Sequence, residues 1–184
     1  MKFEKHSLLE GQHAYLSASK HAWVNYDDEK FDRVYKAYQM AQRGTDLHDL
    51  ASRAIKLGVK MPRNSKTINM YVNDAIGYRM EAEQILFYSF NCFGTADAIC
   101  FRDNMLRIHD LKTGSTRVSM VQLEIYAALF CLEYDQNPND IEIELRIYQN
   151  DQVVTHIPDG SDIRRIMDRI VEFDKRIESL KEAA

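Results

Sequence analysis

The chain has 184 residues, of which 45% are hydrophobic, and it carries a formal net charge of −4. This length fits one domain, and this hydrophobic fraction is enough to build a core. The acidic balance argues against a simple DNA-coating protein, which should be basic, but net charge is a weak discriminator, because carboxylates that hold a metal add negative charge.

Other features of the sequence argue against further classes. No apolar run approaches the roughly 18 residues that a membrane-spanning helix needs, and the N-terminus lacks the apolar core of a signal peptide. The three cysteines, Cys92, Cys100 and Cys131, are odd in number and form no CxxC pair. This argues against a disulfide framework, a zinc ribbon and an iron–sulfur cluster. We expect a soluble, cytoplasmic protein with no membrane contact.

The first 80 residues are expected to be mainly helical. Residues 28–42 place apolar side chains at helical spacing. Gly44 and Thr45 then predict a restart of the chain, with Thr45 as the N-cap of a second helix that ends at Leu57. Residues 65–80 predict a third helix, with the first residue of that range, a serine, as its cap.

The pattern changes to strands near Glu83. Alternating or continuous apolar runs predict strands over residues 84–90, 94–102, 105–112, 141–148 and 152–157. Asp103-Asn104 predicts a hairpin turn between the second and third strands. A helix over residues 119–133, capped by Ser119, follows the third strand. We therefore expect an α/β (α+β) single domain, with a central mixed sheet in residues 83–157 and helices on its faces.

A last helix is predicted over residues 161–182. It places apolar side chains along one stripe: Ile163, Ile166, Met167, Ile170, Phe173, Ile177 and Leu180. Arginines and lysines lie around this stripe. A helix packed on the domain is the favoured interpretation, ahead of a basic flank that contacts phosphate.

Three residues of the predicted hairpin carry chemistry. Asp110 and Lys112 are two positions apart on one strand, so their side chains point to the same face. Asp97 lies on the preceding strand, and the turn brings it opposite Asp110. Two adjacent carboxylates repel each other, and a divalent cation such as Mg²⁺ relieves the repulsion because it prefers oxygen ligands.

Such a cation lowers the pKa of a bound water and stabilises charge in a phosphoryl transition state, while a lysine beside it orients the water or neutralises phosphate. A site that hydrolyses phosphodiesters is therefore one interpretation of Asp97, Asp110 and Lys112. An ordinary Asp–Lys ion pair on a hairpin is the other. Spacing alone does not choose between them.

Four motifs occur in order along the chain. Residues 94–99 read Gly-Thr-Ala-Asp-Ala-Ile, and residues 109–114 read His-Asp-Leu-Lys-Thr-Gly. Gln122 and Tyr126 form a Q-x-x-x-Y pattern on the next helix, and residues 44–48 upstream form a G-x-x-x-H pattern. Together they resemble the G-x-x-x-H, G-x-x-D-x-I, D-x-K-T-G and Q-x-x-x-Y signature of RecB-like and phage-type PD-(D/E)XK nucleases.

The resemblance implies a restriction-endonuclease-like core with a Mg²⁺ or Mn²⁺ centre. The metal ligands that it implies are His48, Asp97, Asp110 and the backbone carbonyl of Leu111. Lys112 would position or activate the attacking water. Gln122 and Tyr126, four positions apart on one helix face, would line the site and contact DNA or the lysine.

The chain departs from the family pattern at Ser52, where the helix motif often has a glutamate four residues after the histidine. This departure weakens the case for a second metal position. Glu83 could supply a carboxylate from the first strand, but a solvated residue at a strand end is favoured. His48 alone could be an ordinary helix histidine, although the motif favours a metal role. For Tyr126, a place in the core and a place in the site are equally supported.

The function implied by the resemblance is a metal-dependent DNA nuclease. Exonuclease action in phage or prophage DNA processing or recombination fits the branch, and endonuclease action stays open because its core chemistry is the same. Threading of a strand end would need a homo-oligomer, and a phage recombination protein is another expected partner. The alternative is a catalytically inactive or partner-dependent DNA-binding or structural protein on the same fold, which the acidic balance and Ser52 support.

Overall fold

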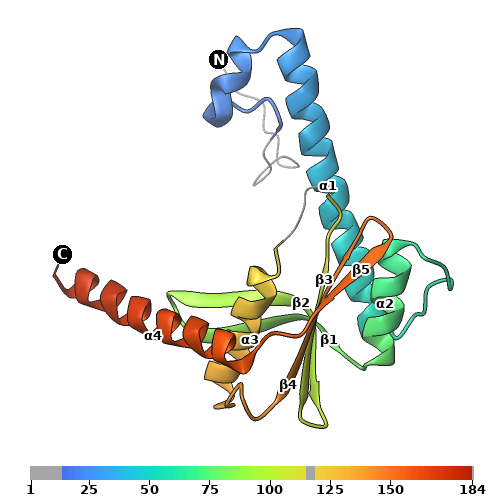
Figure 1. The fold of residues 1–184 in the computed structure, drawn as a ribbon. Helices are drawn as coiled ribbons and strands as arrows, with labels where there is room; N and C mark the ends of the chain where they lie inside the picture. The colour runs from blue at the N-terminus through green and yellow to red at the C-terminus, as the bar shows by residue number, and fades with distance from the viewer. Residues whose placement is uncertain (1–13, 115–118, 184) are drawn as a thin grey trace, which may run out of the picture. The chain divides into compact units, whose positions relative to one another are not determined.

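The computed structural model of the chain describes residues 14–114 and 119–183. Its elements in chain order are η2 (Ala18–Asn25), α1 (Asp28–Leu57), α2 (Thr67–Gly77), β1 (Glu81–Ser89), β2 (Cys92–Arg102), β3 (Met105–Leu111), α3 (Val121–Glu133), β4 (Glu142–Gln149), β5 (Gln152–His156) and α4 (Gly160–Glu182) (Figure 1). Contacts divide the chain into two compact units, with the boundary between Gln42 and Arg43, inside α1. The N-terminal residues 1–13, where no signal peptide is expected, lie outside the described residues.

The five strands form one mixed sheet in the order β1-β2-β3-β4-β5. Only β3 and β4 pair in parallel, because α3 carries the chain back between them; the other neighbouring pairs are antiparallel. The hairpin turn at Asp103-Asn104 is confirmed, since both residues adopt the positive φ that a tight hairpin requires, 50° and 60°. The expected α+β class with a central mixed sheet is therefore confirmed.

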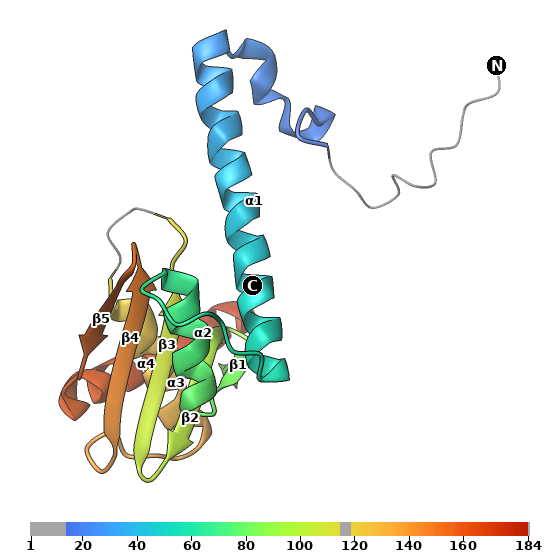
Figure 2. The ribbon, with the colours of Figure 1, turned by 90° about the vertical axis from the view of Figure 1, so that its right-hand side faces the viewer.

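Helices cover both faces of the sheet (Figure 2). On one face, α3 and α4 bury a core with Ile108 and Leu145. On the other face, α2 and the last turns of α1 bury a second core, which contains Tyr71 and Tyr148. This arrangement follows from strand alternation, because neighbouring residues of β3 point to opposite faces.

The predicted break between two helices at Gly44-Thr45 is wrong, because α1 runs unbroken from Asp28 to Leu57. Gly44 is buried inside it, and a Cβ atom there would lie only 2.7 Å from the hydroxyl oxygen of Thr113. The glycine therefore permits a close contact with the loop after β3 and does not end a helix.

Two predicted caps are also wrong. The N-cap of α2 is Lys66 and not Ser65, and no side chain among the described residues caps it. The N-cap of α3 is Met120, although the hydroxyl of Ser119 accepts a hydrogen bond from the Val121 amide at 3.3 Å. Each N-cap lies one residue later than the serine that was predicted to form it. Contacts of the helices with the sheet outweigh this local signal.

Only the first half of the apolar stripe on α4 packs against the sheet unit. Ile163 and Met167 are buried, whereas Phe173, Ile177 and Leu180 remain 47%, 37% and 63% exposed. The favoured interpretation of a helix packed on the domain therefore holds for the first half of α4, and the last turns leave part of the apolar stripe exposed.

The three cysteines are unpaired in the described part of the chain, and burial raises the pKa of the Cys131 thiol to about 11.

In the unit that ends at Gln42, Trp23 donates its indole N–H to the carbonyl of Ser17 at 3.0 Å, and Tyr15 packs edge-on against Tyr35. No helix among residues 14–114 and 119–183 is long and apolar enough to cross a bilayer.

Candidate metal-dependent active site

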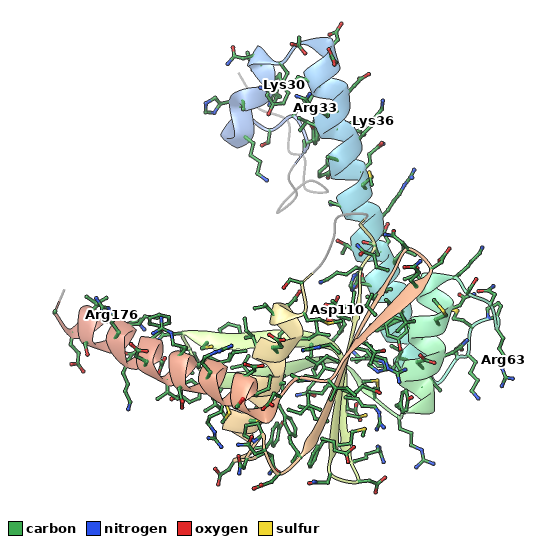
Figure 3. All side chains as sticks on the ribbon, in the orientation of Figure 1. Lys30, Arg33, Lys36, Arg63, Asp110 and Arg176 are labelled. Atoms are coloured by element: carbon green, nitrogen blue, oxygen red, sulfur yellow. The ribbon has the colours of Figure 1, made fainter. Side chains whose placement is uncertain are left out.

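The β2–β3 hairpin places two carboxylates side by side. Its register pairs Ala98 with His109, so Asp97 and Asp110 lie opposite each other one step further along. Asp97 accepts a hydrogen bond from the Leu111 amide through its Oδ2 atom at 2.9 Å. Asp110, labelled in Figure 3, is buried. The fold therefore concentrates negative charge where β3 ends.

A third carboxylate and an imidazole join Asp97. Glu83 on β1 lies opposite Asp97, since its neighbours Ala82 and Gln84 pair with Ala98 and Ala96. His48 on α1 approaches from the helix side, with 3.4 Å between its Nδ1 atom and Oδ2 of Asp97. One ligand atom from each of His48, Glu83 and Asp97 lies within 4.8 Å of the other two.

The backbone of Glu83 is strained. Its φ angle is +57°, in the left-handed region that a residue with a side chain rarely adopts, least of all within a strand. The sequence prediction treated Glu83 as a solvated strand-end residue and began its strand at residue 84, whereas β1 begins at Glu81. A strand extended by three residues would have brought Glu83 into register with Asp97.

Burial and neighbouring charge make ionisation of Asp97 unfavourable. Burial is the larger cause and Asp110 the next, and together they raise the pKa of Asp97 to about 6, against the opposing effects of the Leu111 amide and His48; Glu83 raises it further. A bound cation would reverse this balance, because it favours the carboxylate forms.

Lys112 sits between two acceptors. Its Nζ atom donates to Oδ1 of Asp110 at 2.9 Å and to Oε1 of Gln122 at 2.9 Å. The amide nitrogen of Gln122 donates in turn to the Tyr126 hydroxyl at 3.1 Å. A Cβ atom at Gly94 would lie 2.9 Å from the Tyr126 ring, so this glycine lets the ring approach β2. Residues of the motifs at 94–99 and 109–114 and of the Q-x-x-x-Y pattern are therefore linked by one series of contacts.

The donor set fits a hard divalent cation. Asp110 is only 3% exposed, and its Oδ2 atom has no hydrogen-bond partner among the described residues. A buried carboxylate oxygen without a donor is costly unless a cation binds it. Carboxylates with one imidazole suit Mg²⁺ or Mn²⁺, and Mn²⁺ accepts nitrogen more readily. Leu111, whose carbonyl is a predicted ligand, directly follows Asp110. Ser52 is buried on α1 and has no carboxylate that could bind a second metal.

The structure thus brings together His48, Asp97, Asp110, Leu111, Lys112, Gln122 and Tyr126, and it adds Glu83. Comparison of the chain with protein-family models, with curated proteins and with solved structures finds no match.

Proposed function

We propose that the protein is a Mg²⁺- or Mn²⁺-dependent deoxyribonuclease that hydrolyses phosphodiester bonds. The observation that carries this proposal is the buried Asp110, whose Oδ2 atom lacks a partner among the described residues while Lys112 holds its Oδ1 atom. An ordinary ion pair would satisfy the carboxylate, and a structural role would not call for Asp97 and Glu83 nearby.

Each residue has a distinct role in the proposed reaction. Asp97, His48 and Glu83 would hold the cation together with Asp110, whose Oδ2 atom is buried without a hydrogen-bond partner among the described residues, and the Leu111 carbonyl would complete the ligand set. The bound cation supplies Lewis-acid chemistry, which makes a water more acidic and offsets phosphate charge. Lys112, fixed by Asp110 and Gln122, donates a hydrogen bond to the attacking water or to a non-bridging phosphate oxygen.

The motif resemblance supports a finer proposal within this function. DNA is the proposed substrate, and exonuclease action in phage or prophage DNA processing or recombination is the proposed context. A homo-oligomer or a phage recombination protein is the proposed partner. These points rest on the order of the four motifs and on fold-level analogy.

A second candidate function is a partner-dependent DNA-binding or structural protein on the same fold. The exposed side chains of Phe173, Ile177 and Leu180 on α4 favour it, because a contiguous apolar surface often marks a protein contact. In that case the active-site groups would act only in a complex, or not at all.

Cleavage assays separate these candidates. Linear, circular and single-stranded DNA are incubated with the purified protein in Mg²⁺, Mn²⁺ or EDTA. Lys112→Ala should lower the rate by about 100–1,000-fold, the size of effect seen when one transition-state donor is removed. The exposed Lys60→Ala is the matched control. Cleavage of linear DNA alone indicates an exonuclease, and no cleavage by the wild type in any condition favours the second candidate.

Metal binding tests the ligand assignment independently of catalysis. Calorimetric titration with Mn²⁺ should show binding to the wild type and none to Asp97→Asn, because Asp97 is itself a proposed ligand and lies beside His48 and the Leu111 backbone. Unchanged Mn²⁺ affinity in this variant would refute the assignment.

A further inference from the structure

A cavity of about 320 Å³ adjoins the candidate active site. Its wall includes Leu111 and Lys112, which directly follow Asp110, and Leu47, which directly precedes His48 on α1. The cavity therefore shares with the proposed metal centre both the end of β3 and the same turn of α1. If one nucleotide of a DNA strand lay in the cavity, the adjoining phosphodiester group of the strand would lie near the proposed metal ligands.

The cavity wall combines apolar and positively charged side chains. Leu47 and Ile68 supply apolar surface, and Leu47 is 39% exposed, so this surface is accessible. Lys66 and Lys112 supply positive charge on the same wall. Apolar side chains hold an unstacked base by its faces, and lysines neutralise backbone phosphate. The cavity wall therefore offers an apolar surface for the base of a nucleotide and positive charge for its phosphate.

The cavity is held open by a set of hydrogen bonds between α2 and the turn after β4. Oδ1 of Asp151 accepts from the amide and the hydroxyl of Thr67, at 2.8 and 3.0 Å, and the Asp151 amide donates to that hydroxyl oxygen at 2.7 Å. These bonds engage the Oδ1 atom of Asp151, the one acidic residue among those that line the cavity. A pre-formed pocket of this kind binds its ligand without the cost of ordering a loop.

We propose that this cavity is a nucleotide subsite that takes one unpaired nucleotide of a DNA strand. The base lies between Leu47 and Ile68, and the phosphate lies at Lys66 and Lys112. The volume is at the lower end of the roughly 300–1,000 Å³ of small-ligand pockets, so it admits one nucleotide and not a base pair. The preferred substrate is then single-stranded DNA or an unpaired end. This inference rests on the proposed nuclease function.

The test uses the full chain with Ca²⁺ in place of Mg²⁺, so that binding is measured without turnover. The probes are a fluorescent single-stranded oligonucleotide and a deoxynucleoside monophosphate. Leu47→Ser and Lys66→Ala should each weaken binding by about five- to tenfold, the loss of roughly one base contact or one phosphate contact. Leu50→Ser and Lys60→Ala are the matched controls, since both side chains are exposed and neither lines the cavity.

A second comparison addresses the form of the substrate. A duplex with unpaired terminal nucleotides should bind more tightly than the same duplex with blunt, fully paired ends, and Leu47→Ser should remove most of this difference. Equal binding of the two duplexes by the wild type overturns the subsite, as does an equal loss of affinity in Leu47→Ser and Leu50→Ser.

Failure of the subsite and failure of the nuclease proposal give different results. If Leu47→Ser and Lys66→Ala bind like the wild type while Lys112→Ala still abolishes cleavage, the subsite is wrong and the nuclease proposal stands. If the wild type neither binds nor cleaves DNA with any metal, both are wrong. Mn²⁺ affinity should be unchanged in Leu47→Ser, which shows that the variant keeps its fold and its metal centre.

Discussion

Asp97 is a carboxylate whose ionisation the fold opposes. Its native pKa of about 6 lies above the ordinary value of 3.8, chiefly because of burial and the charge of Asp110. A raised native pKa means that the folded state holds the proton more tightly than the unfolded chain does. Protonation of Asp97 therefore stabilises the folded state. This stabilisation is fully present below about pH 4 and is lost as the pH rises through 6.

Replacement of Asp97 by asparagine should stabilise the metal-free protein. Above about pH 6, Asp97→Asn should raise the free energy of unfolding by up to about 2–3 kcal/mol, because the amide carries no charge to bury. Urea unfolding in EDTA at pH 7.5 and at pH 4 measures the effect, which should shrink at the lower pH. A destabilised Asp97→Asn at pH 7.5 would contradict this account.

Glu83 is the residue that the structure adds to the candidate site. Glu83→Gln should weaken Mn²⁺ binding by about 10–100-fold, since loss of a ligand should cost at least as much as loss of a group that supports one. Calorimetric titration measures this affinity. Glu81→Gln, on the same strand and also exposed, is the control and should bind Mn²⁺ like the wild type. Equal affinity in the two variants would return Glu83 to the solvated role predicted from sequence.

At the scale of elements, two glycines set how closely the parts of the site approach. Gly44 brings α1 against Thr113 in the loop after β3, and Gly94 brings β2 against Tyr126 on α3. The Gly44 contact joins α1, which carries His48, to the segment that contains Lys112. The Gly94 contact joins β2, which carries Asp97, to α3, which carries Gln122 and Tyr126. A methyl group at either position would come within 3.0 Å of a side-chain atom, so the Thr113 hydroxyl or the Tyr126 ring would have to shift.

Gly94→Ala should impair catalysis more than stability. The added methyl would displace the Tyr126 ring and with it the Gln122 contact that helps to hold Lys112. We expect a fall of about tenfold or more in cleavage rate, in line with the sensitivity of rates to small misplacements. Gly77→Ala is the control, because a Cβ there meets nothing within 4 Å among the described residues. Similar rates for both variants would show that the ring position does not matter.

How far the elements can be predicted depends on whether their signal is local. The alternation of β4 and the turn at Asp103-Asn104 are local signals, and both were predicted from sequence. The continuity of α1 through Gly44 depends on Thr113, which is distant in sequence, so the local glycine signal misled the prediction. Glu83 was named from sequence as a possible carboxylate, but its approach to Asp97 was not predicted, because the two residues lie across a strand pair. The proximity of Asp97, Asp110 and Lys112 was predicted because a single hairpin joins them.

At the scale of the whole molecule, α4 leaves an apolar surface in solvent. A cavity of about 560 Å³ lies beside it, lined in part by Ile125, Ile170 and Phe173. The native protein should therefore bind the dye ANS, which reports exposed apolar surface.

Ile177→Ser combined with Leu180→Ser should reduce the ANS fluorescence. It should change the free energy of unfolding by less than about 1 kcal/mol, because both side chains are already partly or mostly exposed. Val59→Ser, at an exposed position away from this cavity, is the control. Fluorescence that does not fall in the double variant would place the dye elsewhere.

The long helix α1 has a consequence for exchange of its amide protons with solvent. All of its buried residues, from Gly44 to Ile55, lie in the part that belongs to the sheet unit. Amides after Arg43 therefore open only when that unit opens, whereas amides before it depend largely on helical hydrogen bonds near the surface. Deuterium uptake should step down sharply along one uninterrupted helix, so that its two ends report on two different stabilities.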